Sequence, residues 1–314
     1  MATSNLPYLM NKGLTIAHDM VGQTHEPVGR KLFHYQKTAS SYDMVQHTTG
    51  HATLPQPRGF GDGIVESSMT PGFAKTYIQV NFGLKDVIAN ELIERDEYGM
   101  LVKWVNSRGG DLAELYATND ELSAVSVFKA GFSTTTPAPG SPDGQPLFSA
   151  SHPTSPTNSV TWSNMPPVTM PFGMAALQAA RAALETQAKA NGITKWDNKI
   201  DKVVFHPNIE EIVLQCLYGD WNPGSADLAM NTMKNRGIQP ISWPYWEVSG
   251  SSNATAYNSW FVQGKTHYCR WFVLQPVKFK QQEILGINST MFASFLTQVL
   301  GFDAAWGMFG SLAT

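Results

Sequence analysis

The chain has 314 residues, of which only 15% are charged, whereas about 25% is typical of soluble proteins. The net charge of −3 argues against a protein that coats nucleic acid, because such proteins carry a basic excess. No apolar run reaches the roughly 18 residues of a membrane helix. Hydrophobic residues make up 42%, so the length allows two or three domains with a sizeable core. With little charge and many aromatic residues, we expect partners to cover much of the surface.

The first seven residues lack the basic and apolar regions of a secretory signal. Cys216 and Cys269 are 53 positions apart, which gives neither a disulfide framework nor a zinc site. We expect reduced, buried thiols in a protein made in the cytosol.

Residues 1–84 show little periodicity and contain five of the eight histidines. The run 54–63 is rich in turn-forming residues, and Asp62-Gly63 is typical of a hairpin tip. No run here could form a core by itself. We therefore expect an extended arm and a long hairpin, which lie either on the rest of this chain or on a neighbouring copy.

The next segment has apolar residues at helical spacing. One run consists of Leu84, Val87, Ile88 and Leu92, and another of Leu101, Val102 and Val105, so we expect helix in both. After Gly109-Gly110, Asp111 and Glu114 form a capping-box pattern, which predicts a new helix from Asp111 to a stop at Gly131.

Residues 133–170 contain eight of the 19 prolines and no Lys or Arg, so they predict a loop or an irregular hairpin. An alanine-rich helix follows, with Thr169 as its cap and Asn191-Gly192 as its end. Residues 202–218 then predict a strand, a turn at His206-Pro207-Asn208 and a helix. Strand-like runs follow at 238–241, 259–262, 269–274 and 277–279.

Known catalytic motifs are missing from the sequence, which has no G-x-S-x-G elbow, no H-E-x-x-H and no P-loop. His47 and His51 could hold a metal, but we favour polar residues on an extended arm. His152 and His206 each precede a proline and could act as general bases. We favour turn histidines whose rings bond the local backbone, and we place Asp143 in a β-turn.

Other polar and aromatic groups also have structural interpretations that we favour. Four acids predict a solvated helix face rather than metal ligands: Glu91, Glu94, Asp96 and Glu97. The glycosylation sequons at Asn253 and Asn288 are taken as chance. The C-terminal aromatics predict core or subunit contacts rather than a sugar platform: Trp243, Tyr245, Trp246, Trp260, Trp271 and Trp306. We therefore expect no catalytic, cofactor-binding or metal-binding residue.

The order of these elements resembles the major capsid proteins of tailed bacteriophages, which have the Hong Kong 97-type fold. It is most similar to the Mu-like major head subunit group. The loop 143–153 is similar to that group's "DG…LF…HP" stretch, and 202–208 to its strand-to-helix entry. The segment 235–245 and the ending 306–311 are similar as well. The resemblance covers the chain from about residue 85 to the end.

The resemblance implies an α+β fold with five parts. They are an N-terminal arm (1–50), an extended loop in hairpin form (51–83), a peripheral domain with a long spine helix (84–197), an axial domain (198–270) and the return strands of both domains (271–314). It implies a structural protein, not an enzyme and without cofactors, which assembles through hexamers and pentamers into an icosahedral shell around double-stranded DNA.

The resemblance also implies partners. These are further copies of the chain, portal, scaffolding and decoration proteins, and packaged DNA held without sequence specificity, but no membrane. The expected location is the virion, after assembly in the host cytoplasm. A mildly acidic shell is not expected to adhere to the DNA that enters it.

Two alternatives stay open. One is an encapsulin-like nanocompartment shell of the same fold, and the other is a hydrolase or carbohydrate-binding protein that uses the aromatic-rich C-terminal half. Particle mass separates a shell from an enzyme. Deletion of residues 1–60 is expected to leave residues 85–314 folded but to abolish stable particles.

Overall fold

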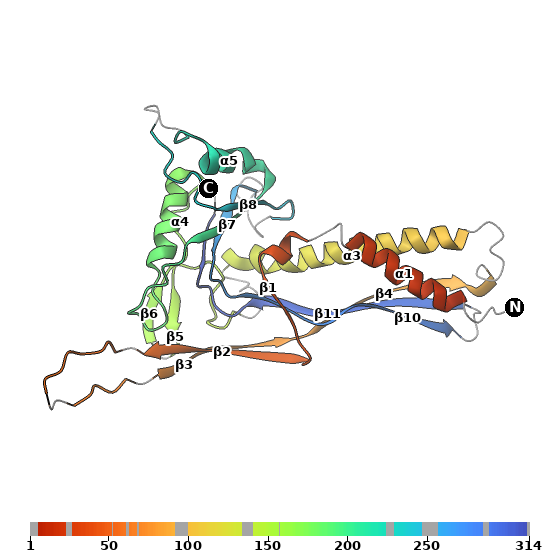
Figure 1. Ribbon diagram of the computed structural model, residues 1–314, viewed down its shortest axis with the longest axis horizontal. Coiled ribbons are helices and arrows are strands. Elements are labelled where there is room, and N and C mark those ends of the chain that lie inside the picture. The colour runs from red at the N-terminus through yellow and green to blue at the C-terminus, as the bar shows by residue number, and fades with distance from the viewer. Residues whose placement is uncertain are drawn as a thin grey trace. The chain divides into compact units, whose positions relative to one another are not determined.

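The computed structural model describes the chain in eleven stretches: residues 6–22, 27–51, 53–60, 63–67, 69–91, 100–133, 141–156, 158–223, 229–246, 257–284 and 289–312. The chain divides into two compact units. Unit 1 contains Met1–Asp43, Tyr77–Ala124 and Trp271–Leu300, and unit 2 contains Met44–Thr76, Val125–Arg270 and Gly301–Thr314. Figure 1 shows their elements along the chain.

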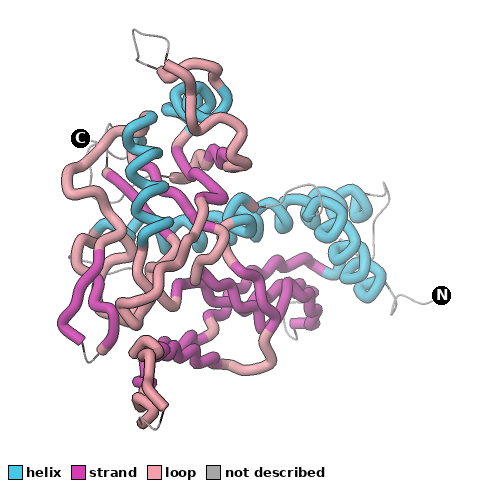
Figure 2. Tube along the Cα trace, turned by 60° about the vertical axis from the view of Figure 1, so that its left-hand side comes forward, coloured by secondary structure: helices cyan, strands magenta, loops and turns pink. Residues whose placement is uncertain are grey.

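Unit 1 is built from a four-stranded sheet and the helices on it. The strand order is β1-β10-β11-β4, and the strands are β1 (His34–Lys37), β10 (Cys269–Ile284), β11 (Ser289–Phe302) and β4 (Val80–Ala89). The helices are α1 (Leu6–Gly22), the short 3-10 helix η2 (Val28–Lys31) and most of α3 (Met100–Lys129). Figures 1 and 2 show α1 and α3 on one face of this sheet.

The core of unit 1 lies between the sheet and these helices. Leu14 of α1, Val105 of α3 and Phe292 of β11 form a buried cluster with Ile88 of β4. Successive strand residues point to opposite faces, so Phe292 and the residues two and four positions beyond it face the helices. Burial of large apolar side chains contributes about 1.5–3 kcal/mol each, which makes this layer the main source of stability for unit 1.

Two expectations for unit 1 are wrong. Residues 80–89 form strand β4, not the start of a helix, and pair with β11 in an antiparallel register that sets Asp86 opposite Phe292. Asp111 does not cap a new helix, because α3 runs unbroken from Met100 to Lys129. The predicted end near Gly131 is confirmed, since a 3-10 turn, η3 (Ala130–Phe132), follows the helix.

The leading segment of the chain, made of α1, η2 and β1, packs on unit 1 of its own chain. Of the two positions expected for it, on its own chain or on a neighbouring copy, the structure shows the first. It is not wholly extended, because α1 is a helix of 17 residues. Leu14, Leu32 and Phe33 are buried in unit 1, and β1 pairs with β10. Deletion of residues 1–60 would therefore uncover the core of unit 1, and the expectation that the remaining body would stay folded is withdrawn.

Unit 2 contains a second sheet, with strand order β12-β9-β7-β8. Its strands are β12 (Met308–Ser311), β9 (Trp260–Gly264), β7 (Ile200–Phe205) and β8 (Gln239–Ser242). The predicted βα unit is confirmed: β7 leads through η4 (Pro207–Ile209) into α5 (Glu210–Tyr218), and β8 returns parallel to β7. Helix α4 (Met174–Thr186) packs on this sheet.

Two further expectations concern unit 2. The proline-rich segment contains an irregular hairpin, as predicted, made of β5 (His152–Ser155) and β6 (Asn158–Trp162).

Thr169 does not cap α4, whose N-cap is Gly173, and the helix ends at Thr186, before the predicted Asn191-Gly192. Those two residues form a separate turn, in which Asn191 Oδ1 accepts hydrogen bonds from backbone N–H groups and Gly192 has a φ of +70°.

No helix within the described ranges is long and apolar enough to cross a membrane.

Candidate functional site

Most of a long hairpin belongs to unit 2. Its strands are β2 (Tyr42–His51) and β3 (Met69–Ile78), which form a two-stranded sheet. At Gly72 an added Cβ would lie 2.9 Å from the backbone oxygen of His47. Only glycine therefore allows the two strands to approach this closely at that point.

The segment between these strands exposes large apolar side chains. Phe60 is fully exposed, Ile64 is 83% exposed, and Leu54 and Val65 are each more than half exposed. Figure 1 shows this segment as an open loop beyond the ends of β2 and β3. Exposed apolar residues that gather on one segment mark a contact with another molecule. The predicted tip at Asp62 lies outside the described residues.

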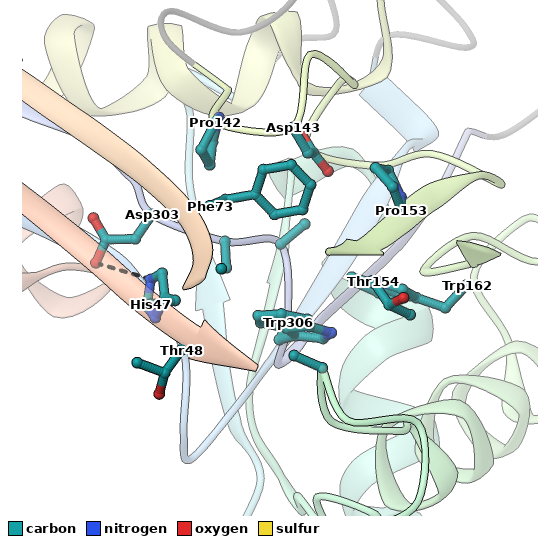
Figure 3. Close-up of a pocket in the computed structure, with 14 residues that line it drawn as sticks. His47, Thr48, Phe73, Pro142, Asp143, Pro153, Thr154, Trp162, Asp303 and Trp306 are labelled. Carbon is teal, nitrogen blue, oxygen red and sulfur yellow. Dashed lines mark ion pairs between the residues drawn. The ribbon is translucent and has the colours of Figure 1, made fainter. Parts of the chain in front are cut away.

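Beside the hairpin strands, basic side chains lie around one buried carboxylate. The side chain of Asp303 is completely buried and forms an ion pair with Arg270. His47 Nε2 lies 3.9 Å from Asp303 Oδ2 (Figure 3). Lys75 of β3 donates to the backbone oxygen of Phe302 over 2.9 Å, next to Asp303. Basic side chains from both hairpin strands thus lie near a single acid, whose burial is tolerable because Arg270 pairs with it.

Burial also changes the proton affinities of the two hairpin cations. It lowers the pKa of His47 below its ordinary value, although Asp303 opposes the change. Burial lowers the pKa of Lys75 to about 8, again against the attraction of Asp303. The charged forms of both residues are therefore disfavoured in the folded state.

A small cavity adjoins this cluster, and Figure 3 shows Phe73, Trp162 and Trp306 around it. Its volume is about 20 Å³, which fits roughly one water molecule and is far below the 300–1,000 Å³ or so of ordinary ligand pockets. The indole N–H groups of Trp162 and Trp306 make no hydrogen bond to any described residue. The cavity is too small for a substrate or a cofactor.

Asp143 and His152 form a buried pair in the proline-rich loop. His152 Nδ1 lies 2.7 Å from Asp143 Oδ2, and the imidazole stacks on Trp162. Burial raises the pKa of Asp143, but the hydrogen bonds from His152, Ser141 and a backbone N–H outweigh it, so the pKa lies below its ordinary value. The prediction that His152 bonds local backbone is wrong, because its partner is a carboxylate. The pair closes the loop from Ser141 to β5.

The other residues singled out in the sequence do not come together in one site. His51 Nδ1 lies 3.2 Å from Ser67 Oγ in the hairpin. His206 Nδ1 accepts from the backbone N–H of Asn208 over 3.3 Å, which confirms the predicted turn histidine. Of the four acids predicted on one helix face, only Glu91 lies in the described residues. The two sequons also fall wholly or partly outside them.

The cysteines and the tryptophans belong to the core. Cys216 and Cys269 are buried free thiols, as predicted, and burial raises their pKa values to about 11 and about 12. All five predicted C-terminal tryptophans are buried, whereas Tyr245 is 41% exposed. In the stretches that the structure describes, no three His, Cys, Asp or Glu residues are grouped to hold a metal ion.

Sequence reasoning missed Asp303 and the basic residues near it, Arg270, Lys75 and His47. A signal was present, because Asp303 is the only acid in the nearly uncharged segment from Phe292 to Phe309. A lone acid in an apolar segment predicts a buried charge, and a buried charge requires a cationic partner. The distance along the chain from Asp303 to Arg270 hid which cation that partner would be.

Comparisons with known proteins place the fold. No protein-family model matches the chain, and no curated protein matches its sequence. Among solved structures it is similar to a chain of the bacteriophage PhiM1 mature capsid, with a TM-score of 0.56 and 11% identity over 92% of this chain and 87% of that one.

Two other solved structures are similar over about the same extent. One is a chain of the capsid of the empty GTA particle, with a TM-score of 0.54 and 10% identity over 91% of this chain and 89% of that one. The other is from Microbacterium phage Oxtober96, with a TM-score of 0.53 and 9% identity over 92% and 91%. The Mu-like subgroup stays a prediction. The chain has the α+β, Hong Kong 97-type fold of tailed-phage capsid proteins.

Proposed function

We propose that this chain is a major capsid protein, which assembles into a closed icosahedral shell through hexamers and pentamers. The observation that carries the proposal is the fold, shared over about nine-tenths of the chain with chains of phage and GTA particle capsids. These matches favour a virion shell over a nanocompartment.

The hairpin supports self-association. Its loop exposes Phe60, Ile64 and Val65, whose burial against another copy would contribute about 25 cal/mol per Å² of apolar surface. A loop on one copy that meets a different surface on the next makes a heterologous contact, which closes into rings. The described leading segment packs on its own unit, so among the described N-terminal residues we assign contact with a neighbour to the hairpin.

In the proposed shell, each segment of the chain has its own structural role. Residues 1–50 serve as the arm, 51–83 as the extended loop, 84–197 as the peripheral domain, 198–270 as the axial domain and 271–314 as the return strands. These divisions describe roles in a shell, whereas the two compact units describe packing within one chain.

The proposed role is structural, with no reaction catalysed. The two buried carboxylates that could act in catalysis are each paired with a basic side chain. Asp143 pairs with His152, and Asp303 pairs with Arg270. Portal, scaffolding and decoration proteins and packaged double-stranded DNA are the further partners of such a shell. Its location is the virion, after assembly in the host cytoplasm.

The test is the mass and shape of the purified full-length chain. Sedimentation and electron microscopy are expected to show rings or closed particles of megadalton mass. A uniform small oligomer at all concentrations, with or without host extract to supply assembly factors, would contradict the proposal.

A further inference from the structure

The small cavity beside Asp303 in unit 2 is lined by two tryptophans whose indole N–H groups are unpaired. Trp162, at the end of β6, stacks on Trp306 with ring centres 5.9 Å apart. The Nε1 atoms of both side chains are buried, and neither makes a hydrogen bond to any described residue. Figure 3 shows the Trp306 nitrogen on the side of Thr154 and Trp162. Two donors without a described acceptor thus belong to the lining of one cavity.

A buried indole N–H normally has a partner. It can only donate, and roughly 90% of buried polar groups in proteins are hydrogen-bonded. Trp246 follows this rule, because its Nε1 donates to the backbone oxygen of Ser259 over 2.7 Å. Trp196 Nε1 is also unpaired among the described residues, but Trp196 does not line the cavity. What distinguishes Trp162 and Trp306 is a space beside them that can hold an acceptor.

The size and the charge of the cavity restrict what that acceptor is. Its volume of about 20 Å³ exceeds the roughly 10–15 Å³ that one water molecule needs and excludes larger molecules. The two N–H groups disfavour a cation. The carboxylates of Asp143 and Asp303 also line the cavity, and they disfavour an anion. A single neutral acceptor satisfies all of these conditions, and a water molecule has that size.

Water also has two hydrogens to donate, and the lining supplies acceptors for them. An ionised carboxylate accepts about four hydrogen bonds. Asp143 receives three from described groups, which are the His152 ring, the Ser141 hydroxyl and the backbone N–H of Gln145. One position on its carboxylate is left. Thr154 donates its own hydroxyl hydrogen to a backbone oxygen over 3.1 Å, so its oxygen can accept.

We propose that this cavity binds one ordered water molecule, which accepts hydrogen bonds from Trp162 and Trp306 and donates to Asp143 and Thr154. A buried water with several partners is part of the fold and is costly to remove. This one joins the proline-rich segment to the segment after β11. Both strands of the long hairpin line the same cavity, so the water lies where three parts of unit 2 meet. The inference does not depend on the proposed shell.

The direct test is a crystallographic density map of the full-length wild-type chain, at a resolution that shows ordered waters. We expect a peak about 2.7–3.2 Å from Nε1 of both Trp162 and Trp306, in crystals grown with or without halide. A second map, from crystals soaked in bromide, identifies a halide by its anomalous scattering. No peak, a halide at the peak, or a protein group bonded to either indole would overturn the proposal.

A second measurement uses an isostere that removes the indole N–H and keeps the shape of the ring. In benzothienylalanine a sulfur atom replaces the N–H group. If a water accepts from Trp306, this replacement at Trp306 removes a hydrogen bond, and the equilibrium constant for unfolding should rise about two- to tenfold. The same replacement at Trp246, whose acceptor is Ser259, should raise the constant to a similar extent and is the control.

An N–H group without a partner gives the opposite result. Its removal relieves a desolvation cost, so the constant for the Trp306 replacement would stay at the wild-type value or fall, while that for Trp246 rises. That outcome contradicts the bound water. If a replaced chain does not fold, the density map of the wild type decides by itself.

Discussion

Gln298 of β11 donates a hydrogen bond from Nε2 to Asp120 Oδ1 of α3, over 2.7 Å, in the interior of unit 1. The indole N–H of Trp271 donates in turn to Gln298 Oε1 over 2.9 Å. Arg30, in the leading segment, lies 3.4 Å from Asp120. This network joins two strands, the long helix and the leading segment.

Replacement of Gln298 by alanine should destabilise the chain by about 1–3 kcal/mol, because it removes the partner of Asp120 Oδ1 and of the indole N–H of Trp271. Urea unfolding measures the change. Gln281→Ala, at an exposed position of β10, should stay within about 0.5 kcal/mol of wild type. Equal midpoints for the two variants would show that the network contributes no stability.

Gly109 gives a second prediction, in which replacing a helix glycine by alanine lowers the stability instead of raising it. Alanine in place of a glycine inside a helix normally stabilises it by about 1 kcal/mol. At Gly109 an added Cβ would lie 2.5 Å from Cβ of Ala17 in α1, so Gly109→Ala should destabilise the chain. Ser107→Ala, at an exposed site on the same helix, should be neutral or slightly stabilising. A higher melting temperature for Gly109→Ala would show that α1 does not pack against α3 at this position.

His47 gives a prediction for how the stability of the folded chain depends on pH. Burial lowers its pKa below 6.5 in the folded chain, so the unfolded chain takes up a proton first as the pH falls. The contribution of His47 to stability is therefore present above pH 6.5 and is lost as the pH drops through the folded-state pKa. His47→Phe, which keeps a ring beside Tyr268 and Trp306, should lose less stability than wild type between pH 7 and pH 5.

Unfolding at the two pH values checks this, with His34→Phe as the control at an exposed histidine. A wild type and a His47→Phe variant with identical pH dependence would show that His47 is not the group that titrates.

Local patterns predicted the elements of unit 2 better than those of unit 1. The turn His206-Pro207-Asn208 and the strand before it were predicted, because turn residues and a short apolar run determine them locally. Strand β4 was mistaken for a helix because Leu84 and Val87, which point to opposite faces of the strand, are both apolar, which hides the period of two. Sheet pairing with β11, some 200 residues away, decides its structure.

The site and the leading helix escaped prediction for a related reason. Gly13 lowers the helix propensity of α1, yet Leu14 of the same helix packs in one buried cluster with Val105 and holds α1 in place. Gly109 was interpreted as a helix break, although its role is close approach to Ala17. The cluster around Asp303 depends on tertiary contacts between distant segments, so only its lone acid was visible beforehand.

In the proposed shell, the apolar hairpin loop lies against another copy of the chain. Both native thiols are buried with raised pKa values, so a cysteine introduced as Phe60→Cys is the one reactive thiol among the described residues. Its rate of labelling is compared between assembled particles and subunits released from them. Labelling at least tenfold slower in particles is the result we expect, whereas equal rates would show that the loop stays exposed and that assembly does not use it.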